Sequence, residues 1–238
     1  MKRIRAQAKV ELLLTLRRGE SLLVLAGIPV AILVFFSSVH VLPRPGRTVD
    51  FLVPGVLALS VIASAMTSLG IATGFERHAG VLRRLGTTPL GRSGLFAAKL
   101  VALALVVAVQ VVLIAGVGKA LGWRPHGSAV VAGALVVLGT IAFAAIGFTL
   151  AGALRAETNL AVANALFLAF LLLGGVIVPV SRLPDALARL ARILPAAPLA
   201  TALRAALSNH AVNGSDVIVL SAWVVLASLV GARTFRWD

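Results

Sequence analysis

Six apolar segments, separated by short polar stretches, constrain the fold of this chain more than any other feature. A helix needs about 20 apolar residues to cross the roughly 30 Å of hydrocarbon in a bilayer, and each segment reaches or approaches that length. The segments lie near residues 21–39, 51–74, 93–118, 128–152, 160–180 and 215–232. They predict an all-α integral membrane protein with six transmembrane helices, in which residues 1–238 form a single transmembrane domain.

The composition agrees with a membrane protein and argues against other classes. Hydrophobic residues make up 60% of the 238 residues, whereas the apolar share of a soluble domain is about half. A net charge of +14 would suit a nucleic-acid-binding protein, but the basic residues stand at the ends of the apolar segments, so we expect no nucleic acid partner. The chain has no cysteine, which excludes disulfides and thiolate metal sites.

Lysine and arginine are divided unequally between the two sides of the predicted membrane domain. Fourteen of the 22 fall on one side, in residues 1–20, 75–99, 153–159 and 233–238. The two short loops on the other side carry four, and the longer segment 181–214 on that side carries four more. The positive-inside rule therefore predicts that both termini and residues 75–92 face the cytoplasm.

The first 20 residues mix basic side chains with leucine, isoleucine and valine. This composition is typical of a helix that lies in the inner membrane interface, with its basic side chains reaching the lipid headgroups. We expect such an interfacial helix before the first span, and a disordered basic anchor is the alternative.

Between the fifth and sixth spans, residues 183–207 carry leucines at helical spacing. The first set consists of Leu183, Leu187, Leu190 and Leu194. Pro195 and Pro198 are expected to end this helix before a second one, and neither helix is long enough to cross a bilayer. We therefore expect two short helices on or in the outer leaflet, with an ordinary amphipathic loop as the alternative.

No motif for catalysis or nucleotide hydrolysis occurs in the chain. Gly118-Lys119-Ala120 lacks the hydroxyl that a phosphate-binding loop offers to magnesium, and none of the four histidines has a second ligand three or four residues away. We predict that the chain is not an enzyme and holds no cofactor or metal of its own.

The polar residues predicted near mid-membrane depth are uncharged, and they include Ser64, Thr67, Gln110 and Asn164. Ion-driven carriers usually keep ionisable groups at that depth, so this pattern disfavours proton or sodium coupling. Hydrogen bonding between helices is the simpler role for each of these side chains, and contact with a transported molecule is the alternative.

The polar stretch FERHAGVLRRLGTTPLGR, residues 75–92, interrupts the apolar segments. Written as a helix over residues 75–85, it places His78, Val81, Leu82 and Leu85 on one face. Gly86 is expected to end this helix, which is far too short to cross a membrane. Its apolar face needs a cover, and the residues alone leave inner-leaflet lipid and a partner protein equally open.

Two motifs resemble those of a known family. The run F-E-R-H-A-G-V-L-R-R-L-G-T-T-P-L-G-R, followed by Lys99, is similar to the E-R-x-x-G-T-L-x-x-L-x-x-T-P-L-x-R pattern of permease subunits of type-2 ATP-binding-cassette (ABC-2) exporters, a group that includes the daunorubicin-exporter permeases. Later, G-V-x-x-P-V-S-x-L-P, then L-P-x-x-P-L and Arg204, resemble the family's segment between its fifth and sixth spans. Val81 departs from the usual Thr, and His78 stands where a charged residue is common.

The resemblance implies particular roles for residues of this chain. The helix between spans two and three would be a cytoplasmic coupling helix that contacts the ATPase subunit. The positions that match this role are Glu76, Arg77, Val81, Leu82, Arg84 and Leu85. The translocation path would run along a permease interface near spans one, two and five, with Ser64, Thr67, Asn164 and Phe167 as candidate lining residues.

The resemblance also implies an assembly. The chain would be the permease of an exporter in a bacterial plasma membrane, moving an amphipathic or lipid-like substrate such as a drug, lipid or glycolipid. Two copies of a cytoplasmic ATPase subunit would bind ATP and Mg, and a second permease chain, identical or related, would complete the complex within membrane lipid. The alternative function is a structural or regulatory membrane subunit that associates with an ATPase and transports nothing.

Overall fold

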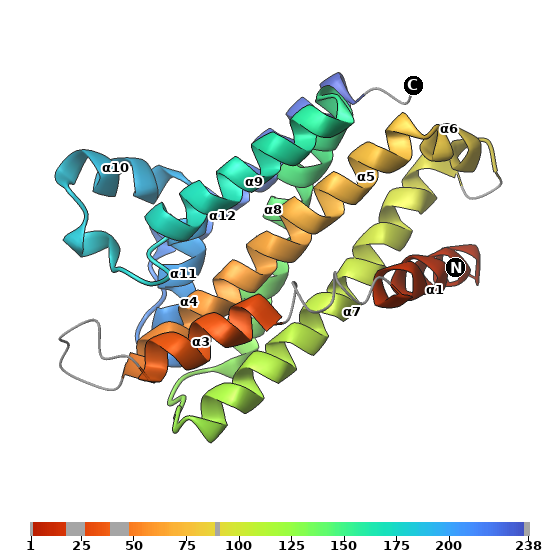
Figure 1. The fold of residues 1–238 in the computed structure, drawn as a ribbon. Helices are drawn as coiled ribbons and strands as arrows, with labels where there is room; N and C mark the ends of the chain where they lie inside the picture. The colour runs from red at the N-terminus through yellow and green to blue at the C-terminus, as the bar shows by residue number, and fades with distance from the viewer. Residues whose placement is uncertain (1, 18–26, 39–47, 89–90, 236–238) are drawn as a thin grey trace.

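The computed structural model describes residues 2–17, 27–38, 48–88 and 91–235, and within them every regular element is a helix (Figure 1). The helices are α1 (Lys2–Arg17), α3 (Ile28–Ser38), α4 (Thr48–Ile62), the π-helix η2 (Ala63–Ser68), α5 (Leu69–His78), α6 (Val81–Gly86), α7 (Gly91–Ala120), α8 (Ala129–Ala153), α9 (Ala156–Leu173), the 3₁₀ turn η3 (Val180–Arg182), α10 (Asp185–Ile193), α11 (Ala196–Leu207) and α12 (Gly214–Thr234). The prediction of an all-α membrane fold is confirmed.

Five helical stretches in the described residues are long and apolar enough to cross a membrane. They are Thr48–His78, Ser93–Ala120, Ala129–Ala153, Ala156–Leu173 and Gly214–Thr234, and they correspond to the second to sixth predicted spans. The first predicted span is represented by α3, an apolar helix of 11 residues that packs on α4. The rest of that span, residues 21–26 and 39, lies outside the described residues.

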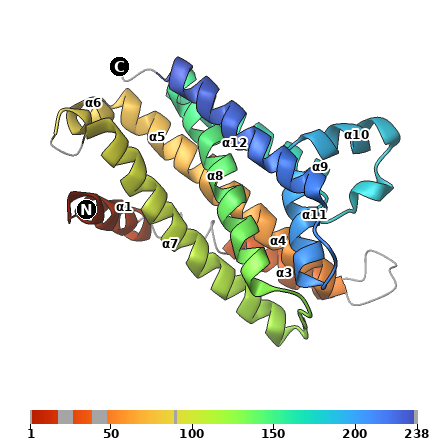
Figure 2. The ribbon, with the colours of Figure 1, turned by 180° about the vertical axis from the view of Figure 1, so that it is seen from behind.

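The centre of the bundle is the continuous stretch formed by α4, η2 and α5. It runs diagonally through the molecule, with α7 and α8 on either side (Figures 1 and 2). Many of its apolar side chains, among them Ile62 and Met66, are fully enclosed. Nearly every residue of α4 is buried because neighbouring helices cover it on several sides.

Glycine permits a close contact between helix backbones in the bundle. A Cβ placed on Gly147 of α8 would lie 2.8 Å from the carbonyl oxygen of Met66 and 2.9 Å from that of Ala65. From the other side, a Cβ on Gly70 would lie 3.0 Å from the Gly147 carbonyl oxygen. Backbone therefore meets backbone where η2 and α5 cross α8, as small residues allow in membrane helices.

The segment between α9 and α12 contains two short helices, α10 and α11, bent by 82° relative to each other. Pro195 precedes α11, but Pro198 lies in its first turn, so the expectation that both prolines separate the helices is wrong for Pro198. Proline fits there because the first turn of a helix leaves backbone N–H groups without intrahelical partners. Most of α11 is buried against α4, α8 and α12, so this helix enters the bundle while α10 stays on its outside.

Arg204 of α11 ties this segment to α4. Its guanidinium donates hydrogen bonds to the carbonyl oxygens of Phe51, Gly175 and Val176, and its carbon Cζ lies 3.7 Å from the centre of the Phe51 ring. Arginine suits this position because its planar group donates in several directions and stacks on an aromatic face. One side chain of α11 thus binds both the turn after α9 and the start of α4.

Candidate functional site

The polar stretch at residues 75–88 forms the end of one helix and the whole of another. Residues 75–78 continue the long central stretch, and α5 ends at His78. Gly80 adopts a φ of +70°, a left-handed conformation that glycine tolerates best, and α6 begins at Val81. The prediction of one uninterrupted helix over residues 75–85 is therefore wrong.

The short helix α6 has an inward and an outward side. Leu82 is 1% exposed and packs where α6 meets α7, whereas Leu85 is half-buried. Val81 is 37% exposed, and Arg83 and Arg84 are exposed as well. The predicted shared apolar face of Val81 and Leu82 is wrong because consecutive residues of a helix point in different directions, and in α6 Leu82 points into the chain while Val81 is exposed.

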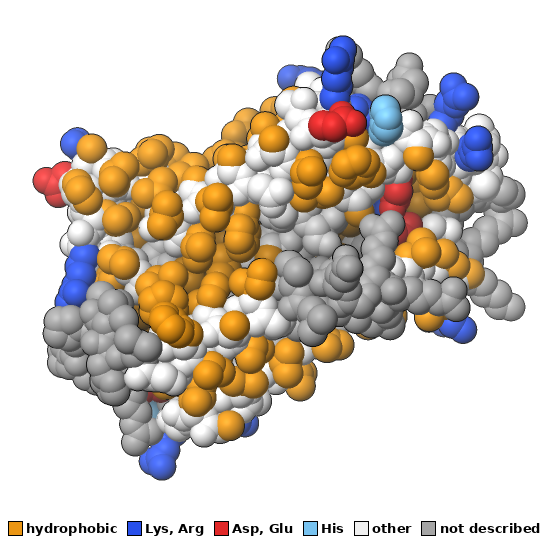
Figure 3. All heavy atoms as spheres, viewed as in Figure 1, with side chains coloured by type: hydrophobic (Ala, Val, Ile, Leu, Met, Phe, Trp, Pro, Cys, Tyr) orange, Lys and Arg blue, Asp and Glu red, His pale blue; other side chains and the backbone are white. Residues whose placement is uncertain are grey.

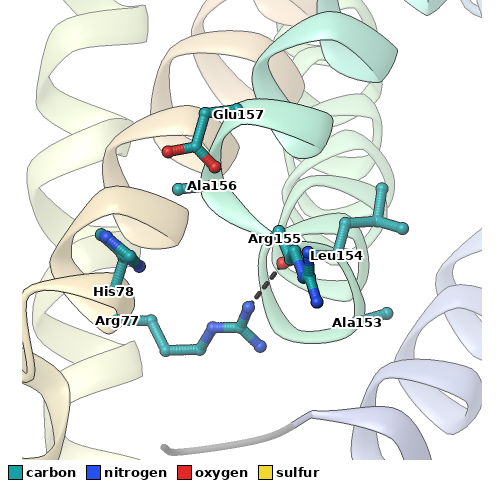
Figure 4. A pocket seen from close by; sticks show the side chains of 7 residues that line it. All are labelled: Arg77, His78, Ala153, Leu154, Arg155, Ala156 and Glu157. Carbon is teal, nitrogen blue, oxygen red and sulfur yellow. Dashed lines mark hydrogen bonds between the residues drawn. The ribbon is translucent and has the colours of Figure 1, made fainter.

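Arg77 connects the end of α5 to the end of α8. Its guanidinium donates to the carbonyl oxygens of Gly152 and Leu154, each at 2.5 Å. Figure 4 shows this side chain reaching across to the turn between α8 and α9. The last carbonyl groups of a helix lack intrahelical donors, and an arginine can supply them. Arg77 thus links the end of α5 directly to the end of α8.

A cavity of about 530 Å³ opens beside this contact (Figure 4). It is lined by Arg77, His78, Ala153, Leu154, Arg155, Ala156 and Glu157. The lining thus joins the end of α5 to the α8–α9 turn. Both elements lie at the end of the bundle that carries α6, the start of α1 and the end of α12 (Figure 1).

Glu76 points inward, toward a buried lysine. The Lys99 Nζ atom lies 2.7 Å from Glu76 Oε2 and 3.1 Å from Glu11 Oε2. The side chain of Lys99 is only 2% exposed, and those of Glu11 and Glu76 are 13% and 22% exposed. This ion cluster (Glu11, Glu76 and Lys99) joins α1, α5 and α7. Sequence reasoning missed Glu11, because its partner is 88 residues away and no local pattern connects the two.

The candidate path residues of η2 lie in the protein interior. The Ser64 hydroxyl donates to Gln110 Oε1 of α7 at 2.8 Å, and both side chains are buried. Thr67 is half-buried in the same π-helical turn. A cavity of about 70 Å³ lies between the ion cluster and Ser64, and it is lined by Glu11, Ser64, Ser68 and Lys99 together with the apolar residues Leu69, Ala72, Ala102, Leu103 and Val106.

The candidate path residues of α9 lie elsewhere. Asn164 is exposed on the outer surface of that helix, and Phe167 is half-buried against the core. Sequence reasoning missed Asn159, which lies just before the predicted fifth span. Its amide donates to the Gly70 carbonyl oxygen at 2.9 Å and fastens α9 to α5. Contact of any of these residues with a transported molecule stays a prediction.

Comparison with known proteins identifies the chain at the level of a family. A family model described as ABC-2 type transporter matches residues 2–208, which include the ion cluster, both sides of α6 and the bent pair α10 and α11. No curated protein matches the chain. The matched region contains four of the five membrane-crossing helices, and the chain therefore belongs to the ABC-2 type transporter family and is a multi-pass membrane permease.

Proposed function

We propose that this permease is the membrane subunit of an ATP-driven exporter whose ATP is bound and hydrolysed, with Mg, by a separate cytoplasmic subunit. One observation carries the proposal: α6 exposes Val81, Arg83 and Arg84 while Leu82 anchors the helix from behind. A short helix held rigidly on its inner side and open on its outer side is suited to receive another protein. Family membership supports an ATPase partner of this kind.

The contacts around α6 suggest how ATPase movement reaches the membrane. Arg77 holds the end of α8, and Glu76 holds Lys99 of α7 and, through it, α1. A displacement of α6 and the end of α5 would therefore move α8, α7 and α1 together. ATP binding would favour one of two arrangements of these helices, and the exporter would alternate between them as the ATPase closes and reopens.

A second permease chain is part of the proposal, giving two permeases and two ATPase subunits. Asn164 supports it, because its side chain is exposed on α9, a helix apolar enough to cross the membrane. An amide facing hydrocarbon is costly, whereas an amide facing another helix forms a hydrogen bond.

The substrate would be amphipathic or lipid-like, in keeping with the uncharged Ser64, Thr67 and Gln110, and daunorubicin-like drugs are one candidate class.

Val81→Asp is expected to release the ATPase without unfolding the permease. A carboxylate buried in an interface without a partner costs several kcal/mol, and about 1.4 kcal/mol weakens binding tenfold, so copurified ATPase should fall at least tenfold and export should stop. The matched control is Val130→Asp, the same substitution at a position 82% exposed near the start of α8, at the opposite end of the bundle. Wild-type amounts of ATPase with Val81→Asp would contradict the proposal, whereas ATPase binding with no export by the wild-type pair would favour the non-transporting subunit.

The proposed orientation places α6 and both termini in the cytoplasm of a bacterial cell. Because the chain lacks cysteine, a single introduced thiol reports one position. Ser93→Cys, at an exposed position near the start of α7, should react only with reagents that enter the cytoplasm, and His126→Cys should react from outside. Gly127 is unsuitable because a Cβ there would lie 1.9 Å from the Ala206 carbonyl oxygen. Outside labelling at Ser93 would reverse the orientation and remove α6 from the ATPase.

A further inference from the structure

Three arginines stand on the side of the membrane where the positive-inside rule expects few basic residues. The segment 181–214 carries four arginines, and one of them, Arg204, is explained by its hydrogen bonds to backbone carbonyl groups inside the protein. The other three are Arg182 at the end of η3 and Arg189 and Arg192 on α10, and all three are exposed. The positive-inside rule does not account for these basic residues on the outer side, so their position needs another physical explanation.

The helix α10 has three different sides, each marked by a pair of residues three apart, which lie close together on a helix surface. Ala188 and Ala191 are 8% and 0% exposed and form the side that packs on the bundle. Leu187 and Leu190 are 40% and 47% exposed and, with Ile193 at 65%, form an uncovered apolar side. Arg189 and Arg192 form the third, on which the exposed Asp185 also lies, four residues before Arg189.

The position of α10 along the bundle matches the outer membrane boundary. The preceding helix α9 has 18 residues and rises about 27 Å, close to the roughly 30 Å of hydrocarbon in a bilayer. In the proposed orientation α9 starts at the cytoplasmic end, so the chain reaches α10 near the outer headgroups. Trp223 of α12 donates its indole N–H to the Ile193 carbonyl oxygen at 2.8 Å and so fixes the end of α10 beside α12.

We propose that α10 binds anionic phospholipids of the outer leaflet, with its leucine side among the acyl chains and Arg189 and Arg192 at the phosphate groups. A helix with adjacent apolar and cationic sides lies in the membrane interface and is attracted to anionic lipid. In Figure 3, the surface around α10 carries hydrophobic side chains, with both basic (Lys or Arg) and acidic (Asp or Glu) side chains at its edge. The choice of the outer leaflet rests on the orientation proposed above. The contact with anionic lipid rests only on the side chains of α10.

The lipid contact would also act on the transporter. Only one bend, at residues 194–195, separates α10 from α11, and α11 is packed between α4, α8 and α12. A helix held at the headgroups therefore fixes the outer end of a buried helix. Anionic lipid is thus inferred to set the position of α11 in the bundle, without being a substrate.

The test uses a fluorescent reporter on α10. An environment-sensitive dye is attached to Ile193→Cys in the purified permease, which is reconstituted in phosphatidylcholine vesicles with increasing phosphatidylglycerol. The dye should move to a less polar environment as phosphatidylglycerol increases. Each basic residue near an anionic surface contributes about fivefold to binding, so Arg189→Gln/Arg192→Gln should raise the phosphatidylglycerol needed for half the response at least tenfold.

The matched control is Arg83→Gln/Arg84→Gln, which removes the same charge from exposed positions at the other end of the protein and should leave the response unchanged. An equal response in the wild type and the α10 variant, or equal weakening by both variants, would overturn the proposal. ATP-dependent movement of phosphatidylglycerol by the assembled complex would overturn it too, by making the lipid a substrate. The reporter assay needs no ATPase and works in either orientation, so its failure is separate from failure of the exporter proposal.

Discussion

Lys99→Met is expected to destabilise the permease by about 3–5 kcal/mol, the usual cost of removing one partner from a buried ion pair. The Lys99 ammonium lies within 3.1 Å of two carboxylates and is 2% exposed, so the variant leaves Glu11 and Glu76 facing each other without a cation. Their repulsion should separate α1 from α7 and loosen the end of α5. The measurement is thermal unfolding of the purified permease in detergent, together with copurification of the ATPase.

Two comparisons make this result specific. Lys119→Met removes the same charge from an exposed position at the far end of α7 and should unfold as the wild type does. Adding Glu11→Gln and Glu76→Gln to Lys99→Met should restore much of the stability, because neutral amides no longer repel each other. Equal stability of Lys99→Met and Lys119→Met would show that the ion cluster does not hold these helices together.

Leu82→Asp is expected to damage the permease itself, in contrast to Val81→Asp. The Leu82 side chain is 1% exposed between α6 and α7, and an unpaired carboxylate there should cost about 4 kcal/mol or more. We expect little folded permease in the membrane and early thermal unfolding of what remains. Loss of the ATPase from this variant would therefore report on folding and not on the docking surface.

The comparison for Leu82→Asp is Leu82→Met, which keeps the volume and should cost less than about 1.5 kcal/mol. The amount of folded permease, its thermal unfolding and the copurified ATPase are measured for both variants and for Val81→Asp. A stable Leu82→Asp permease that has lost its ATPase would mean that Leu82 faces the partner and that the inward side of α6 has been assigned incorrectly.

Long apolar runs made the membrane helices predictable from sequence, but charges near a helix end were misleading. The second span was expected near residues 51–74, followed by a separate helix over residues 75–85, whereas residues 75–78 continue the central helix to His78. It continues because Lys99 neutralises Glu76 and backbone carbonyl groups accept from Arg77. These partners are distant in sequence, so the charged composition of residues 75–78 alone suggested a helix boundary near residue 74 that the backbone does not have.

The direction of the α6 side chains was not predictable for a related reason. Helical spacing placed His78 on one face with Val81 and Leu82, but Gly80 separates His78 from the other two, and the consecutive residues Val81 and Leu82 point in different directions within α6. A glycine inside an apolar pattern is compatible with a continuous helix and with a break in it. The burial of Leu82 where α6 packs on the rest of the chain favours the break at Gly80. The family motif located the segment correctly, while the roles of its residues in ATPase coupling and of Ser64, Thr67, Asn164 and Phe167 in transport stay predictions.

The glycine crossing between η2 and α8 limits where cargo can travel. Backbone atoms already touch there, since a single added carbon on Gly147 would lie 2.8 Å from the Met66 carbonyl oxygen. A molecule of drug or lipid size is far larger than that carbon, so it does not pass along this seam unless the two helices come apart. In this arrangement the seam is a closed wall of the bundle on the α8 side of the central helix.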